Sequence, residues 1–185
     1  MTDARRWRRR TLILIPVLVA YSAWMFTASP FATLSSWGGG TFVFDMTSNY
    51  DEARALENLE ALGPDGRATY RAALVADVGF MLLNAAVVAS LMFWALTHLT
   101  RWPWLRAVIA LPALSLLLDL TENSAIWSML GRFPASPGGA ADVASTVTGV
   151  KLSIVPLVFA AVLLLWLAAA LVRWRAPRQE TSQSR

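Results

Sequence analysis

Four long apolar stretches constrain the fold of this chain more than any other feature. They cover residues 11–28, 72–96, 105–130 and 150–172. Each is close to the roughly 20 apolar residues that a helix needs to cross the hydrocarbon core of a bilayer. The 185 residues leave room for four such helices and their connections, and none for a separate soluble domain. The sequence therefore predicts an all-α, integral membrane four-helix bundle that forms a single domain over residues 1–185.

Composition excludes several other classes of protein and site. The chain is 56% hydrophobic and 15% charged, whereas soluble domains are about 45–50% apolar and about 25% charged. The net charge of +4 does not indicate a nucleic-acid partner, because the arginines lie mostly beside the apolar stretches and set membrane topology there. The chain has no cysteine and one histidine, His98. We therefore expect no disulfide, no thiolate chemistry, no metal site and no cofactor.

The distribution of basic residues predicts the orientation in the membrane. The N-terminal tail, the turn at 101–106 and the tail at 173–185 are basic, whereas the long first loop, residues 29–71, is acidic on balance. Basic segments stay on the cytoplasmic side. Because an even number of spans keeps both tails together, the N- and C-termini are expected in the cytoplasm and the first loop outside.

The first apolar stretch follows five arginines and could be taken for a secretory signal. It is longer than the roughly 7–15 residues of a signal-peptide core, and Pro30 directly after Ala28 and Ser29 is a poor cleavage context. We therefore expect an uncleaved first helix.

The first loop contains the longest predicted structure outside the membrane. Residues 41–45 are typical of a short extended piece, and 51–62 have leucines at helical spacing opposite glutamates. Ser48 and Asp51 have capping-box spacing, and Asp65 is a plausible N-cap of the next helix. The sequence predicts an amphipathic helix that either lies on the membrane surface or caps the bundle.

Polar side chains of the second span fall on one helical stripe. Arg67, Tyr70, Asp77 and Asn84 are separated by three, seven and seven residues. Ionisable groups inside a membrane are costly and are functional candidates for that reason. The structural alternative places Arg67 and Tyr70 at the interface, pairs Asp77 with Arg67 or Lys151, and bonds Asn84 to a neighbouring helix.

The third span carries three polar groups within one turn. Asp119, Glu122 and Asn123 share a face because they are three and four residues apart. Two carboxyl groups this close in a membrane cannot both be comfortably ionised, so we expect a neutral acid beside a charged carboxylate. General acid–base catalysis uses such an arrangement. The alternatives are a buried clasp with Lys151 or Arg67 as counter-ion and, with less support, a hard-cation site.

Lys151 opens the fourth span, after a stretch at 131–149 that is rich in Pro, Gly, Ala and Ser and is expected to be a loop. It either snorkels to the outer interface or acts as counter-ion to the carboxylates. At about 1.5 Å per residue, the polar groups of the second and third spans overlap in depth in the outer half of the membrane. The sequence predicts a polar pocket there, open outward and capped by the first loop.

The polar pattern also supports a resemblance. The run from Gly63 through Arg67, Tyr70 and Asp77, followed by Asp119, Glu122, Asn123 and Lys151, resembles small four-span bacterial membrane proteins of unassigned function. This likeness covers about residues 50–151 and implies a bacterial inner-membrane location. The overall plan is also similar to the EXPERA group of sterol isomerases and lipophilic-ligand receptors. That second likeness is architectural and implies only a lipophilic ligand.

These observations lead to one main hypothesis, in which the bundle binds a lipophilic small molecule and transforms it by acid–base chemistry of an isomerase, hydratase or cyclase type. The candidate catalytic residues are Asp77, Asp119 and Glu122, and the candidate ligand-binding residues are Arg67, Tyr70, Asn84, Asn123 and Lys151. A transporter or proton-coupled accessory subunit is one alternative, although only Ser90 and Ser115 are polar in the inner half of these spans. A structural or assembly role is the other. The expected partners are the bilayer and the small molecule.

Overall fold

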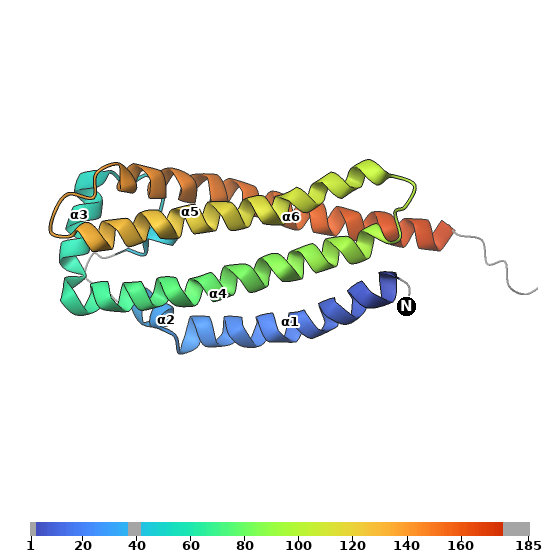
Figure 1. The fold of residues 1–185 in the computed structure, drawn as a ribbon, viewed down its shortest axis with the longest axis horizontal. Coiled ribbons are helices and arrows are strands. Elements are labelled where there is room, and N and C mark those ends of the chain that lie inside the picture. Colours follow the sequence, from blue (N-terminus) through green and yellow to red (C-terminus); the bar gives the residue numbers. More distant parts are fainter. Residues whose placement is uncertain (1–2, 37–41, 176–185) are drawn as a thin grey trace, which may run out of the picture.

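The four apolar stretches form four long helices. The computed structural model describes residues 3–36 and 42–175. Its long helices are α1 (Asp3–Thr27), α4 (Gly63–Leu96), α5 (Ala110–Arg132) and α6 (Gly139–Arg175). They run side by side in alternating directions (Figure 1), and the described part of the chain contains no β-strand. The predicted all-α four-helix bundle is confirmed.

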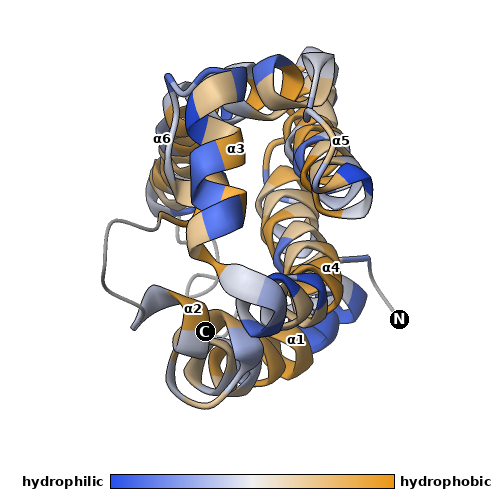
Figure 2. Cartoon of the chain, turned by 90° about the vertical axis from the view of Figure 1, so that its left-hand side faces the viewer, coloured by the Kyte–Doolittle hydropathy of each residue, from blue (hydrophilic) through white to orange (hydrophobic). Residues whose placement is uncertain are grey.

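The long helices are not equivalent in their packing. α4 lies between α1 on one side and the pair α5 and α6 on the other (Figures 1 and 2), and α1 packs chiefly against α4. Buried apolar side chains form two clusters. One lies at the loop end of the bundle and includes Phe44 and Ile126, and the other lies toward the opposite end and includes Met92 and Leu165. The functional side chains described below lie between these two apolar regions.

Close contacts hold α1 against α4. The Tyr21 hydroxyl donates a hydrogen bond of 2.7 Å to the Ala76 carbonyl, and the Thr11 hydroxyl donates one of 3.0 Å to Ser90. A Cβ atom at Gly79 would lie only 2.5 Å from the Tyr21 hydroxyl oxygen, so glycine is needed there for this approach. Small residues that allow close backbone approach are typical of helix contacts in membranes.

The outer faces of the helices are apolar. Val75, Leu117 and Leu164 are 64%, 61% and 64% exposed, and many other large hydrophobic side chains are exposed with them. Soluble proteins rarely expose continuous apolar surface of this extent, whereas lipid-facing helices require it. The uncharged run between Lys151 and Arg173 on α6 spans about 30 Å at 1.5 Å per residue, which matches the thickness of the hydrocarbon core.

Two helix boundaries differ from the sequence prediction. α6 begins at Gly139, so most of the expected loop at 131–149 is helical and that prediction is wrong. The segment is rich in alanine and carries Asp142 in its first turn, both of which favour a helix start. α4 begins at Gly63, so Asp65 lies in its first turn and is not its N-cap.

The third span is preceded by a separate element. η2 (Pro103–Ile109) is a 3₁₀ helix that leads directly into α5, so the expected span at 105–130 begins in 3₁₀ rather than α conformation.

The first loop folds over one end of the bundle. It contains α2 (Pro30–Ser35), a 3₁₀ helix η1 (Phe44–Met46) and α3 (Glu52–Ala61). The extended piece expected at 41–45 is partly wrong, because Phe44 and Asp45 belong to η1. α3 is confirmed as a helix and lies across the end of the bundle in Figure 2, in contact with α4 and α6. The sequence left open whether this helix lies on the membrane surface or caps the bundle, and in the structure α3 caps the bundle.

The N-cap of α3 also corrects the sequence prediction. Asp51 is the cap, and its side chain accepts a 2.8 Å hydrogen bond from the backbone of Arg54. Ser48 does not take that role, because Asn49 has a φ of 64° and breaks any helical turn between them. A single carboxylate cap replaces the expected capping box.

Candidate functional site

Glu122 is the most enclosed charged residue of the described chain. It lies on α5 with 0% of its surface exposed. Two groups from α6 donate hydrogen bonds to its two carboxylate oxygens, the Thr148 hydroxyl and the Lys151 ammonium group. Both partners exist because α6 begins well before residue 150, which places Thr148 one turn ahead of Lys151. The carboxylate is fully satisfied and is sealed from any small molecule.

Lys151 bridges two carboxylates of α5. Besides Glu122, its Nζ atom forms an ion pair of 2.7 Å with the Asp119 Oδ1 atom. The side chains of Lys151 and Asp119 are 18% and 23% exposed, so this pair is less enclosed than Glu122. Asp119 and Glu122 are three residues apart on α5, so their two carboxylate groups both face α6. Of the two roles predicted for Lys151, the structure shows the counter-ion.

A second polar contact joins α4 to α5. The Asn123 amide donates a hydrogen bond of 2.9 Å to the Asp77 Oδ2 atom. Asp77 is thus paired with neither Arg67 nor Lys151, which corrects the structural alternative drawn from the sequence. The Asn123 Oδ1 atom is buried and has no partner in the described residues. We call Asp77, Asp119, Glu122, Asn123, Thr148 and Lys151 the polar cluster.

Arg67 does not reach the polar cluster. Its guanidinium group donates a 2.7 Å hydrogen bond to the Leu59 carbonyl and lies 3.9 Å from the centre of the Phe133 ring. Ten residues separate Arg67 from Asp77, which is about 15 Å along a helix. That distance exceeds the reach of the side chain, so Arg67 joins α3 to the ends of α4 and α5 instead.

Tyr70 turns toward the first loop. It is 1% exposed, its hydroxyl donates to the Asp45 carboxylate, and the Phe44 backbone donates to that hydroxyl at 2.8 Å. η1 therefore inserts its polar end between the long helices, in contact with α5 and α6.

Asp45 is a site residue that sequence reasoning missed, because it is one of several acidic residues in the first loop. Burial raises its pKa, and the charges of Lys151 and Asp119 also act on that pKa. The neighbouring apolar residues Phe42 and Phe44 could have indicated that Asp45 is partly buried. When such aromatic side chains pack into the core, they bring an adjacent acidic residue inside with them. Thr148 was missed as a site residue because its segment was expected to be a loop.

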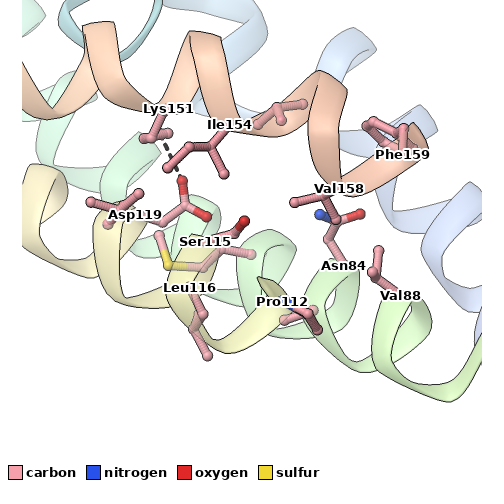
Figure 3. Close-up of a pocket in the computed structure, with 14 residues that line it drawn as sticks. Asn84, Val88, Pro112, Ser115, Leu116, Asp119, Lys151, Ile154, Val158 and Phe159 are labelled. Carbon is pink, nitrogen blue, oxygen red and sulfur yellow. Dashed lines mark ion pairs between the residues drawn. The ribbon is translucent and has the colours of Figure 1, made fainter. Parts of the chain in front are cut away.

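A cavity of about 50 Å³ lies beside the polar cluster, between α4, α5 and α6. Figure 3 shows Asp119 and Lys151 on one side of this space and Asn84 across from them, with Ser115 between. The Ser115 hydroxyl is buried without a partner in the described residues. The remaining walls are apolar side chains: Met81, Ala85, Val88, Pro112, Leu116, Leu118, Ile154, Val155, Val158 and Phe159. We call this space the bundle cavity.

The bundle cavity extends to the lipid-facing surface. Val155 and Phe159 line it and are 40% and 58% exposed on the outer face of α6. A molecule in the surrounding hydrocarbon could therefore reach Asp119 and Lys151 sideways, between helices. Of the predicted site residues, Asn84, Asp119 and Lys151 line the cavity, whereas Asp77, Glu122, Asn123, Arg67 and Tyr70 do not.

The arrangement can support proton transfer and the binding of a polar head group. Asp119 is the carboxylate that lines the cavity, and the ion pair with Lys151 stabilises its charged form. Among residues 3–36 and 42–175, no group of three His, Cys, Asp or Glu side chains is placed to hold a metal ion.

Four long apolar helices with lipid-facing surfaces, packed around buried charged residues, define a multi-pass helical membrane protein. Comparisons of the chain with protein-family models, with curated proteins and with solved structures gave no significant match.

Proposed function

We propose that this protein binds an amphiphilic small molecule from the bilayer, with its polar head in the bundle cavity at Asp119 and Lys151 and its apolar body in the hydrocarbon beside α6. The cavity, of about 50 Å³, has room for the head group alone. One observation carries the proposal: an ion pair lines a cavity whose other walls are mostly apolar and reach the lipid-facing surface. An ion pair with only a structural role would be expected to be closed off by packing. The likeness to the EXPERA architecture agrees with a lipophilic ligand as an analogy.

The charges beside the cavity favour particular head groups. Asp77, Asp119 and Glu122 outnumber the single cation Lys151, and the half-buried Asp45 adds a further carboxyl group from the loop. An anionic head group would add to this excess of negative charge in a region of low dielectric. A hydroxyl or amine head can donate to Asp119 instead. The proposed ligand is therefore an alcohol or an amine with an apolar body.

Chemical conversion of the ligand is an extension of this proposal. Asp119 would exchange a proton with the bound molecule, as in an isomerisation, hydration or cyclisation. Glu122 would then position Lys151 rather than touch the ligand, since it is fully enclosed. Asp77 and Asn123 would hold α4 against α5. This assigns the reacting role to one of the three carboxylates considered from the sequence.

Photocrosslinking tests the proposal. Three diazirine probes share one dodecyl tail and carry an amine, a hydroxyl or a carboxylate head. With the full chain in detergent micelles, we expect the amine and hydroxyl probes to label peptides around Ile154 and Val158. Asp119→Asn should lower this labelling about tenfold, because a hydrogen bond to a charged group contributes about 1.5–3 kcal/mol.

The matched control is Asp142→Asn, the same chemical change at an exposed position of α6 outside the cavity. Equal labelling of the Asp119→Asn and Asp142→Asn variants would mean that the probes only dissolve in the micelle. The proposal would then be rejected.

A structural role is the second candidate, and the sealed contacts of Glu122 favour it specifically. In that case the polar cluster fixes how α5 and α6 pack, and no probe head group is selected. The transporter alternative has less support. Below the bundle cavity, the contact between α4 and α6 is made by apolar side chains such as Met92, Leu165 and Ala169.

We further propose that the protein lies in a bacterial inner membrane with both termini in the cytoplasm. The first residues of α1 and the last of α6 lie at the same end of the bundle (Figure 1). That end carries most of the arginines, whereas the opposite end carries the first loop, which is acidic on balance. The positive-inside bias supports this orientation.

A further inference from the structure

A second hollow, of about 520 Å³, lies at the end of the bundle away from the polar cluster. Its lining comes from three helices: Ala4, Arg5 and Arg8 of α1, Trp94 of α4 with the following His98, and Arg173 of α6. No carboxylate is among these lining residues. We call this hollow the arginine pocket.

The three arginines of the pocket are not neutralised within the described part of the chain. The described ion pairs of arginine involve Arg6 with Asp3 and Arg54 with Glu57. Arg5, Arg8 and Arg173 therefore bring three positive charges to one hollow without a described counter-charge. All three side chains are exposed, so their guanidinium groups are accessible to an anion that binds in the hollow.

The pocket walls are held in place by aromatic contacts. Trp7, on the same helix as Arg5 and Arg8, stacks on Phe93 with ring centres 4.4 Å apart. Trp94 meets Trp166 of α6 edge to face at 4.7 Å. These contacts fix α1 and α6 on two sides of α4, so the arginines face a common space.

His98 lines the pocket as a neutral side chain. Its Nε2 atom is buried and has no partner in the described residues. Burial, and then the positive charge of Arg173, lower the pKa of His98. The imidazole is therefore neutral at pH 7 and can donate one hydrogen bond without adding charge.

We propose that the arginine pocket binds the phosphate head group of an anionic phospholipid. Guanidinium groups match phosphate oxygens with paired hydrogen bonds. The uncharged run of α6 ends at Arg173, which places the pocket at head-group depth, and Trp94 gives it an amphipathic wall. Basic pockets between membrane helices at this depth suit lipid head groups.

The bound lipid would join two helices that otherwise share little contact. α1 and α6 each pack on α4, and direct contact between them is minor. One phosphate held by Arg5 and Arg8 from one side and by Arg173 from the other would fasten α1 to the rest of the bundle. This inference is independent of the proposed ligand cavity, which lies elsewhere in the molecule.

Native mass spectrometry of the full chain in detergent tests the inference, with phosphatidylglycerol or phosphatidylcholine added in steps. We expect one phosphatidylglycerol per chain to bind about tenfold more tightly than phosphatidylcholine. The double variant Arg8→Gln/Arg173→Gln should lose most of this preference. The matched control, Arg9→Gln/Arg101→Gln, removes two positive charges outside the pocket and should keep it.

Two results would overturn the inference. Equal loss of the preference in both double variants would mean that general surface charge attracts the lipid. Displacement of phosphatidylglycerol by millimolar inorganic phosphate would mean that the pocket recognises a free anion and not a lipid. Near-ultraviolet circular dichroism of each variant checks that the packing of the aromatic side chains is unchanged, so that a misfolded variant is not counted as loss of binding.

Discussion

At the residue scale, two carboxylates of the polar cluster that look alike in the sequence have different surroundings in the structure. Glu122 and Asp119 lie one turn apart on α5 and share Lys151, yet Glu122 is 0% exposed and Asp119 lines the bundle cavity. The difference arises because Thr148 covers one oxygen of Glu122. A change at Glu122 should therefore act on stability, and a change at Asp119 on binding.

Glu122→Gln should lower the free energy of unfolding by about 2 kcal/mol. It removes a buried charge partner of Lys151, although Asp119 still compensates part of the loss. Thermal unfolding in detergent, followed by circular dichroism, measures the change. Glu57→Gln is the control, because Glu57 is exposed and its ion pair with Arg54 contributes at most about 1 kcal/mol.

A triple variant sharpens this prediction. Asp119→Leu/Glu122→Met/Lys151→Met replaces all three charged groups by apolar side chains and should recover part of the stability lost by Glu122→Gln. If Glu122→Gln unfolds at the wild-type temperature but loses probe labelling, Glu122 touches the ligand and the assignment of roles above is wrong.

Asp45 gives a prediction for pH. Burial raises its pKa above the ordinary value of 3.8, so the folded chain holds this proton more readily than the unfolded chain. The contribution of Asp45 to stability is therefore most favourable at low pH and is lost as the pH rises from near 4 through the raised pKa.

Asp45→Asn should consequently raise the unfolding temperature at pH 7.5, since the amide can still accept from Tyr70. The gain should shrink as the pH falls through the raised pKa of Asp45 toward 4, because the folded chain then keeps this carboxyl group protonated and neutral. Melting curves of variant and wild type between pH 4.5 and 8 measure this difference. A gain that is constant across the range would contradict burial as the cause.

At the element scale, the contact between α1 and α4 depends on one small residue. Gly79 lies under the Tyr21 ring, and the Tyr21 hydroxyl reaches past it to the Ala76 carbonyl. α1 packs chiefly against α4, so this contact, together with the Thr11–Ser90 hydrogen bond and the Trp7–Phe93 stack, determines how firmly the first span is attached.

Gly79→Ala should destabilise the bundle by about 1–3 kcal/mol, because the added methyl group overlaps the Tyr21 hydroxyl. The same substitution in a Tyr21→Phe background should cost less, since the nearest clashing atom is gone. A double-mutant cycle of unfolding free energies measures this coupling. Strictly additive effects would show that Tyr21 moves aside freely.

At the scale of the whole molecule, charge is segregated between the two ends of the bundle. The first loop places a cap that is acidic on balance over the polar cluster, and the opposite end carries most of the arginines, including those of the arginine pocket. This asymmetry underlies both the proposed orientation and the two proposed binding sites, one for an amphiphile and one for a phosphate head group.

Single-cysteine labelling tests the orientation directly, because the natural chain contains no cysteine. Glu57→Cys on α3 should react with a membrane-impermeant maleimide in intact cells whose outer membrane has been removed. Thr100→Cys at the opposite end should react only after the membrane is permeabilised. The reverse pattern would contradict the proposed orientation.

The sequence by itself determined the number of long helices and their fold class, for a simple physical reason. A chain in hydrocarbon must satisfy its backbone within each segment, so length and apolarity are enough to identify a spanning helix. Distance along a helix is also set by residue count, so the overlap in depth of Asp77 with Asp119 and Glu122 could be predicted. Lys151 was expected above them, near the outer mouth, whereas the structure pairs it with Asp119 and Glu122.

The tertiary structure alone decided which of these groups meet. Rotation about each helix axis and the path of the first loop depend on packing across the whole bundle, which no local pattern specifies. Packing turned Tyr70 toward Asp45 rather than the polar cluster and placed Arg67 over Phe133. It also brought Thr148 to Glu122, sealing one carboxylate and leaving Asp119 to face the cavity.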